Sequence, residues 1–184
     1  MIPTHSLLGR QFCRIRGLYW KALIVSCGGR CGGGLMVGPH VVWKHMPHAG
    51  VEIGTGVVLG SGCIIDAPRG GRLVLADGVK LNAHVYLGCV QSIIIGARTL
   101  IAEFVSIRDA DHGIAAGMPI ASQPLTAAPV VIGDDVWIGR GVAVLRGSVL
   151  GNGVVVGANA VVKGELLANS VYVGVPVRKV TERT

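Results

Sequence analysis

The chain has 184 residues, which suits one domain or one domain with a small appendage. It is 51% hydrophobic but only 4% aromatic, and 29 residues are glycine, so a core filled by bulky rings is excluded and a repeat of thin aliphatic layers is favoured. The formal net charge is +7, no apolar run approaches the roughly 18 residues of a membrane-spanning helix, and no secretory signal pattern is present; we therefore expect a cytoplasmic protein.

The excess positive charge belongs to a basic amphipathic segment, residues 1–50. No acidic residue precedes Glu52, whereas six basic residues do. A helical wheel of this segment has an apolar face opposite a basic one. The apolar face holds Leu8, Phe12, Ile15, Tyr19, Ala22 and Leu23, and the basic face holds Arg10, Arg14 and Lys21.

Two interpretations of this helix stay open. In the first, residues 1–26 lie on an anionic membrane surface, because an apolar face bordered by basic side chains is typical of interfacial helices. In the second, which we favour, the apolar face packs against the end of the following domain and caps it. Both hold together if the basic side remains outward. We expect no binding of nucleic acid, because the segment lacks interleaved aromatic residues and a known binding module.

The five cysteines show no disulfide framework, and in a reducing compartment they are expected to be small buried hydrophobic residues. We also expect no metal site, because the cysteines and histidines between residues 27 and 48 match no zinc-ligand spacing. These residues are Cys27, Cys31, His40, His45 and His48.

From residue 51 onward, aliphatic residues recur every six positions and are often followed by glycine. A period of six matches neither a helix nor a long strand, but it is typical of short strands and tight turns wound into a parallel β-helix. We therefore expect an all-β solenoid in which each coil buries its face on its neighbours. The repeating positions are Ile53, Leu59, Ile65, Leu75, Leu81, Leu87, Ile95, Ile101, Ile107, Ile132, Ile138, Val144, Leu150, Val156 and Val162.

The register divides the chain and marks one functional loop. We expect a β-helix over residues 51–166 and a C-terminal tail over 167–184. The largest break is the step of 25 residues between two repeat positions, which forces residues 109–129 out of the solenoid as a loop. The stretch RDADHGI, residues 108–114, stands at its start, and loops on rigid scaffolds are where function concentrates.

Residues 51–180 resemble the hexapeptide-repeat acyltransferases of left-handed β-helix fold, particularly sugar O-acetyltransferases such as galactoside, maltose and surface-polysaccharide acetyltransferases. The most specific part is VVIGDDVWIGRGVAVLRGSVLGNGVVVGANAVVKGELLANSVYVGVPVRKV, residues 130–180, together with the DH pair and the extended loop before it. The resemblance implies a homotrimer with sites between subunits, which transfers an acetyl group from acetyl-CoA to a carbohydrate hydroxyl without a metal.

The resemblance also implies individual roles. His112 matches the family's catalytic base. Trp137 matches the tryptophan near the acyl arm of the coenzyme. Small residues follow the pantetheine, and basic residues lie near the phosphates. The small positions are Gly139, Gly157 and Ala158, and the basic ones are Lys163 and Arg178. The chain departs from the family where VVKGE and GVPVRK replace the usual sequences, and where Arg140 follows VWIG.

The chemistry of the loop agrees with this resemblance. Transfer to a hydroxyl requires a base, and a neutral imidazole suits that role at cellular pH. Asp109 and Asp111 are both candidates to orient His112 or to bind substrate, and the sequence does not choose between them. Asn82 and His84, one coil earlier, either bind hydroxyl groups of the acceptor or cap a turn.

Four functions compete on this sequence. The leading one is O-acetylation of a sugar in a bacterial surface polysaccharide or its precursor. N-acylation of an amino sugar would use the same fold and coenzyme. A zinc-dependent hydratase on the same fold is disfavoured, because the coils offer only His84 and His112 as ligands. A non-catalytic scaffold would not need the histidine, the loop and the VWIG coil together.

Overall fold

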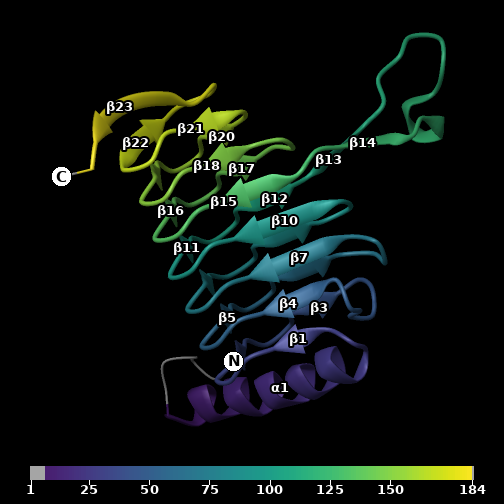
Figure 1. Cartoon of the computed structure of the whole chain (residues 1–184), viewed down its shortest axis with the longest axis vertical. Coiled ribbons are helices and arrows are strands. Elements are labelled where there is room, and N and C mark those ends of the chain that lie inside the picture. Colours follow the sequence, from purple (N-terminus) through teal and green to yellow (C-terminus); the bar gives the residue numbers. More distant parts are fainter. Residues whose placement is uncertain (1–6, 184) are drawn as a thin grey trace.

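The computed structural model describes residues 7–183, which form one α-helix, one solenoid and one extruded hairpin (Figure 1). Helix α1 (Leu7–Ser26) lies across one end of the solenoid. None of the helices in residues 7–183 is both long and apolar enough to cross a membrane. The solenoid winds through three parallel sheets, here named A, B and C, and the order of strands in each sheet follows the chain order of the coils.

The strands are short, with two to four residues in each parallel strand of the solenoid. Sheet A holds β1 (Arg30–Cys31), β4 (Val51–Ile53), β7 (Arg72–Leu75), β10 (Ser92–Ile95), β15 (Val130–Ile132), β18 (Val149–Leu150) and β21 (Glu165–Leu166). Sheet B holds β2 (Met36–Val37), β5 (Val58–Leu59), β8 (Lys80–Leu81), β11 (Leu100–Ile101), β16 (Trp137–Ile138), β19 (Val155–Val156), β22 (Ser170–Val173) and β23 (Arg178–Glu182). Sheet C holds β3 (Val42–Trp43), β6 (Ile64–Asp66), β9 (Tyr86–Gly88), β12 (Ser106–Arg108), β17 (Ala143–Val144) and β20 (Val161–Val162).

The six-residue repeat forms the core of the prism. Equivalent repeat positions of successive coils stack directly on one another, as Ile53 on Leu75 and Leu75 on Ile95 do in sheet A. All fifteen repeat positions predicted from the sequence are buried, with at most 3% of the side chain exposed. The predicted β-helix of hexapeptide repeats is therefore confirmed.

The solenoid is longer at both ends than the expected range of 51–166. Strand β1 pairs with β4, so the first coil begins at Arg30, within the segment assigned to the amphipathic helix. Its inward positions, Cys31, Val37 and Trp43, keep the spacing of six, but two of them are not aliphatic and the pattern is hidden. At the other end, β22 pairs with β19, and β23 folds back on β22 in antiparallel fashion.

Helix α1 caps the solenoid, but with a different face from the one predicted. The docked face carries two buried small residues, Cys13 and Gly17, together with Ile24, which is fully buried in the core. A Cβ atom at Gly17 would overlap the carbonyl oxygen of Leu35, so only glycine permits this close approach. The face predicted to pack is exposed instead, with Leu8, Phe12, Ile15 and Tyr19 between 45% and 63% accessible.

Two further contacts fix the helix on the first coil. The Nε of Arg16 donates a hydrogen bond of 2.9 Å to the carbonyl oxygen of Val37. The ring of Trp20 stacks on that of Trp43, with 5.4 Å between centroids and 28° between planes. The cap thus combines a close backbone approach, one aromatic pair and the buried side chain of Ile24, while most of the other large aliphatic side chains of the helix stay outside it.

The loop expected at residues 109–129 is a hairpin that leaves the prism after β12 (Figure 1). Strand β13 (Ala110–His112) pairs antiparallel with β14 (Leu125–Ala127), and a short 3-10 helix (Ile120–Ser122) lies between them. Asp109 anchors the base of the hairpin. It is fully buried, and its carboxylate accepts three backbone N–H bonds of 2.6 to 2.8 Å, from Val90, Gln91 and Ser92.

The contact of Gly17 with the first coil predicts that alanine at this position destabilises the protein, although alanine has the higher helix propensity. Gly17→Ala should lower the free energy of unfolding by about 1–3 kcal/mol, because a methyl group must displace the backbone of the first coil. In an unobstructed helix the same change would be stabilising by about 1 kcal/mol. Urea unfolding measures this. Leu18→Ala, at the adjacent exposed position, serves as the control and should shift stability by no more than about 0.5 kcal/mol; a stabilised Gly17→Ala variant would contradict the close docking.

The carboxylate anchor makes a second prediction. Asp109→Asn should destabilise the protein by about 2 kcal/mol, because an amide cannot accept all three buried N–H bonds. The matched control is Asp111→Asn. Asp111 is exposed and forms only a surface ion pair, so its loss should change stability by no more than about 1 kcal/mol. Hydrogen exchange of residues 90–92 should increase in Asp109→Asn alone; equal effects of the two variants would remove the anchoring role.

Candidate active site

His112 stands on the extruded hairpin with an exposed side chain. Its backbone pairs with Leu125, and adjacent residues of a strand face opposite sides, so Asp111 points away from it. Asp111 instead receives a 2.8 Å contact from Nε of Arg146, on the neighbouring coil. Within residues 7–183, no hydrogen bond joins His112 to Asp109 or Asp111. Asp109 is not available to bind substrate, contrary to the expectation from the sequence. Its buried carboxylate already accepts hydrogen bonds from three backbone N–H groups.

The hairpin is braced from within by one glutamine. Gln123 is nearly buried, and its Oε1 accepts a 2.7 Å bond from the amide of Ala115. Its Nε2 donates to the carbonyl oxygens of Ala115 and Met118, at 3.0 Å each. These three bonds give the loop a defined shape. Its outer surface is nevertheless apolar and exposed, through Ile114, Met118, Ile120 and Leu125.

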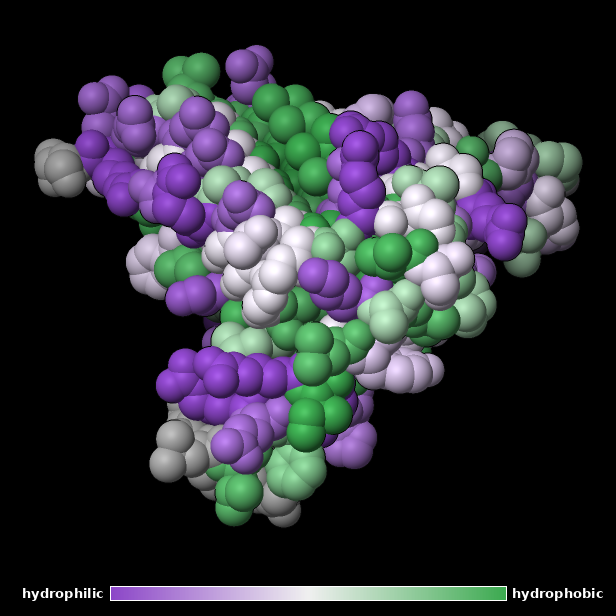
Figure 2. All heavy atoms as spheres, turned by 60° about the horizontal axis from the view of Figure 1, so that its bottom comes forward, coloured by the Kyte–Doolittle hydropathy of each residue, from purple (hydrophilic) through white to green (hydrophobic). Residues whose placement is uncertain are grey.

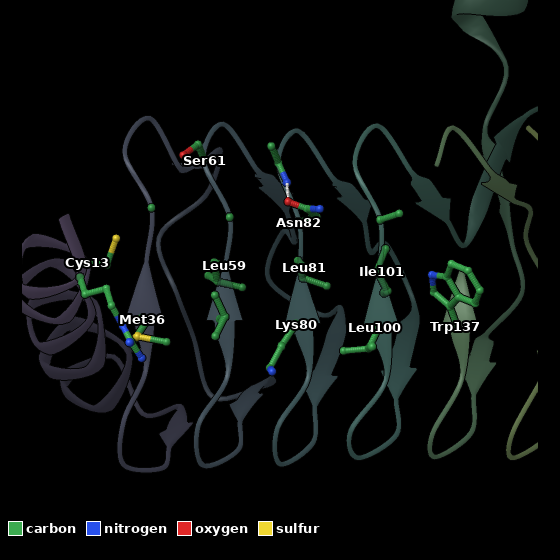
Figure 3. Close-up of a pocket in the computed structure, with 16 residues that line it drawn as sticks. Cys13, Met36, Leu59, Ser61, Lys80, Leu81, Asn82, Leu100, Ile101 and Trp137 are labelled. Atoms are coloured by element: carbon green, nitrogen blue, oxygen red, sulfur yellow. Dashed lines mark hydrogen bonds between the residues drawn. The ribbon is translucent and has the colours of Figure 1, made fainter. Parts of the chain in front are cut away.

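A cavity of about 530 Å³ follows the outer face of sheet B (Figure 3). Its lining is largely apolar. Trp137 lies at one end and is 55% exposed, while Arg10 and Cys13 of α1 close the other end. Asn82 lines the same cavity at the corner between sheets B and C. The structure therefore brings together Asn82 and Trp137, which the sequence assigned to acceptor and coenzyme respectively.

The corner above Asn82 carries a stacked column of side chains. The ring of His84 stacks on that of Phe104, with 5.1 Å between centroids and 8° between planes. The guanidinium of Arg140 lies 5.3 Å from the Phe104 centroid and 3.4 Å from a carboxylate oxygen of Glu103. Glu103 also accepts a 3.4 Å bond from Nδ2 of Asn82. Arg140, where the chain departs from its resemblance, thus takes part in an ordered corner while its side chain stays exposed.

The small residues that the resemblance places along the pantetheine also contribute to the packing of the coils. A Cβ atom at Gly139 would lie 2.8 Å from the amide nitrogen of Ala158 on the next coil, and one at Gly157 would lie 2.8 Å from Val173. Close stacking of the coils therefore requires glycine at Gly139, where the obstacle is backbone, whereas at Gly157 the obstacle is a methyl group of the Val173 side chain. Lys163 and Arg178 are both exposed in the last coils, and neither forms an ion pair within the described part of the chain.

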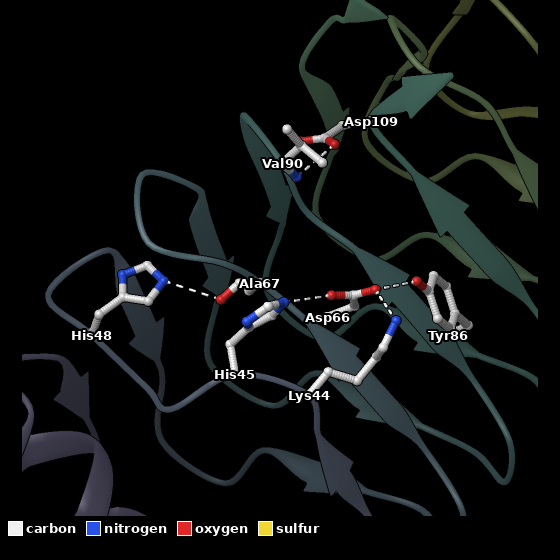
Figure 4. A network of polar contacts seen from close by, with 8 residues as sticks. All are labelled: Lys44, His45, His48, Asp66, Ala67, Tyr86, Val90 and Asp109. Atoms are coloured by element: carbon white, nitrogen blue, oxygen red, sulfur yellow. Dashed lines mark hydrogen bonds and ion pairs between the residues drawn. The ribbon is translucent and has the colours of Figure 1, made fainter. Parts of the chain in front are cut away.

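A polar network that no sequence pattern indicates lies on the outer face of sheet C (Figure 4). Asp66 accepts hydrogen bonds of 2.6 Å from Nζ of Lys44 and from the hydroxyl of Tyr86, and it contacts Nε2 of His45 at 3.1 Å. The guanidinium of Arg108 covers the Tyr86 ring at 4.2 Å. These residues are far apart in the sequence, and only the stacking of coils brings them together, so no local pattern could have indicated them.

The network fixes the charge of its central carboxyl group. Burial acts to raise the pKa of Asp66, but the hydrogen bonds from Lys44 and Tyr86 outweigh it and lower that pKa below its usual value. Burial and the bond to Asp66 raise the pKa of the Tyr86 hydroxyl. Asp66 therefore stays ionised and Tyr86 stays neutral at cellular pH, which leaves a fixed hydrogen-bonded surface beside Arg108, the residue before the hairpin.

The comparisons with known proteins agree with this architecture. Residues 129–164 match the family described as "Bacterial transferase hexapeptide (six repeats)". An Escherichia coli protein, "Putative lipopolysaccharide biosynthesis O-acetyl transferase WbbJ", is 38% identical over 136 residues, covering 70% of this chain and 69% of the relative. Another, "Putative colanic acid biosynthesis acetyltransferase WcaF", is 34% identical over 138 residues, covering 73% of this chain and 70% of the relative.

A solved structure is similar in fold over the whole chain. It is a hexapeptide-repeat acetyltransferase of Vibrio cholerae complexed with acetyl coenzyme A, with a TM-score of 0.65 and 20% identity, covering 100% of this chain and 93% of that chain. At this identity the likeness concerns the fold alone. The repeat, the extruded hairpin and the identity and coverage of the two Escherichia coli relatives together show that the chain belongs to the hexapeptide-repeat acetyltransferases.

Proposed function

We propose that this protein is an acetyl-CoA-dependent O-acetyltransferase that modifies a sugar hydroxyl of a bacterial surface polysaccharide or its precursor. The observation that carries the proposal is the exposed His112 on a braced hairpin, in a chain whose relatives are named for lipopolysaccharide and colanic acid biosynthesis. N-acylation of an amino sugar is the alternative, and the choice of acceptor in the assay below separates the two.

The proposed reaction is direct transfer. The neutral imidazole of His112 takes the proton of the acceptor hydroxyl while that oxygen attacks the thioester carbonyl, and the coenzyme leaves as its thiol once it regains a proton. Two of the cysteines are poorly suited to act as a thiol nucleophile. Cys63 and Cys89 are fully buried, and burial raises the pKa of both thiols, that of Cys89 to about 12. Such thiols remain protonated at cellular pH and are poor nucleophiles.

The donor is assigned to sheet B and the last coils. The exposed indole of Trp137, beside an apolar cavity, suits the acyl arm of acetyl-CoA. Ala158 and its stacked glycines leave a shallow surface for the pantetheine, and unpaired Lys163 and Arg178 are suited to the phosphates. No cluster of three or more His, Cys, Asp or Glu side chains that could hold a metal occurs in residues 7–183.

The acceptor is assigned to the corner and the hairpin. Asn82, His84 and Asp111 are exposed and offer hydrogen-bonding groups to sugar hydroxyls. Asp109 is left out, because its carboxylate is committed to the backbone. The homotrimer implied by the family is supported by the exposed apolar surface of the hairpin, which a neighbouring subunit would cover. We place the enzyme in the cytoplasm at the inner face of the membrane, with α1 as the contact.

The role of His112 as the general base is tested by replacing it with asparagine and by making the same change at a control histidine. His112→Asn should lower the rate of acetyl transfer by about 10²- to 10⁴-fold, the effect of losing a general base. His40→Asn, at an exposed turn of the first coil, should leave it unchanged. Release of coenzyme A thiol is measured with sugars, amino sugars, nucleotide sugars and glycan fragments as acceptors. Equal rates for His112→Asn and wild type would rule out His112 as the base, and turnover with amines alone would favour N-acylation.

The donor site is tested at Trp137. Trp137→Ala should raise the KM for acetyl-CoA by about tenfold or more, because a large aromatic contact is lost. Val149→Ala, an exposed aliphatic residue on sheet A, should leave that KM unchanged. Steady-state kinetics at saturating acceptor measure both. An unchanged KM in Trp137→Ala would move the coenzyme away from the sheet B cavity.

A further inference from the structure

Helix α1 leaves most of its large apolar residues in solvent, although Trp20 and Ile24 pack on the solenoid. A helix on a protein surface normally buries its apolar stripe and exposes its polar side. Here the small-residue face is docked, so the apolar stripe points outward. We name the exposed set the outer face of α1. It consists of Leu8 (62% exposed), Phe12 (45%), Ile15 (60%), Leu18 (68%), Tyr19 (63%) and Val25 (51%).

The outer face occupies one end of the molecule. Helix α1 lies across the axis of the solenoid, so the side opposite the coils faces along that axis and away from the protein (Figure 1). Seen from this end, apolar and strongly hydrophilic side chains lie side by side on the surface (Figure 2). Nothing else in the described chain covers this end, because the hairpin leaves the prism several coils away (Figure 1).

The charges next to this face are all positive. Arg10, Arg14 and Lys21 follow the apolar stripe on the same helix, and no acidic residue occurs before Glu52. Glu52 itself is paired with Arg30 and Arg72 on sheet A. An apolar strip bordered by unneutralised basic side chains matches the chemistry of a bilayer with anionic headgroups, in which apolar residues enter the acyl boundary and cations meet phosphates.

We infer that the outer face of α1 docks on the surface of a bilayer that contains anionic phospholipids. This inference deepens the proposed membrane location by naming the residues and the lipid charge. The inference rests on the proposed function only for the biological purpose of membrane docking. The residues that support the docking do not include His112. The solenoid then stands upright on the membrane, because the docking face is perpendicular to the axis of the coils.

A second copy of the chain fits this face less well. Pairing two outer faces would bring together the basic residues of both helices, with no carboxylate on either helix to neutralise them. Association of subunits through the sides of their prisms would also leave the face open, since it points along the solenoid axis. The charge therefore favours an anionic lipid surface over self-association.

The inference is tested by binding of the full chain to vesicles. Wild type should sediment with phosphatidylcholine vesicles that contain phosphatidylglycerol, and much less with phosphatidylcholine alone. The double variant Ile15→Glu/Leu18→Glu should lose this binding. The matched control is Leu167→Glu, an exposed leucine (59%) at the opposite end of the solenoid, which should bind like wild type. Arg14→Ala/Lys21→Ala should bind anionic vesicles about 25-fold more weakly, at about fivefold for each charge removed.

Three other outcomes overturn the inference, and a fourth removes only the proposed function. Failure of wild type to bind anionic vesicles would do so, and so would binding that is unaffected by Ile15→Glu/Leu18→Glu. If that variant instead halves the mass of the particle in analytical ultracentrifugation, the face is an interface between copies. Vesicle binding without acetyl transfer to any acceptor would leave the docking intact and remove only the proposed enzymatic function.

Discussion

The whole molecule depends on the stacking of one aliphatic side chain per strand on its equivalent in the coils above and below. Each inward residue packs on its equivalents in the neighbouring coils, and the columns from the three sheets meet inside the prism in one continuous core. Leu81, for example, lies between Leu59 and Ile101 in sheet B. The columns leave the outward positions and the turns free of any role in the core. The functional features are accordingly all outside the prism, in the hairpin, the sheet B cavity and the end helix.

The same stacking explains what could be predicted from the sequence. Aliphatic repeat positions and the extruded loop were visible, because both depend on spacing along the chain. The first coil was missed, because Cys31 and Trp43 keep the spacing but not the residue type. The docked face of α1 could not be predicted, since a helical wheel ranks faces by hydrophobicity and cannot show that Gly17 permits a closer backbone approach than a leucine would.

The roles of the two aspartates could not be separated from the sequence for a related reason. Asp109 meets the amides of residues 90–92 only because the preceding coil places them beneath the hairpin. Asp111, two residues later in the sequence, faces outward and pairs with Arg146. The network around Asp66 has the same origin, with partners on three successive coils. In a solenoid, residues separated by one coil are neighbours, and local motifs do not record these contacts.

The regular spacing of coils also fixes the distance between the end helix and the hairpin along the solenoid axis. Sheet C passes from the capped coil to the base of the hairpin through β3, β6, β9 and β12, which is three strand spacings, or about 14 Å at about 4.8 Å each. With the roughly 10 Å diameter of α1, the hairpin stands about 25 Å above the outer face of that helix. Insertion or deletion of one coil would move His112 up or down by about 5 Å without changing its surroundings. The number of coils between the cap and the hairpin therefore sets the height at which the site works.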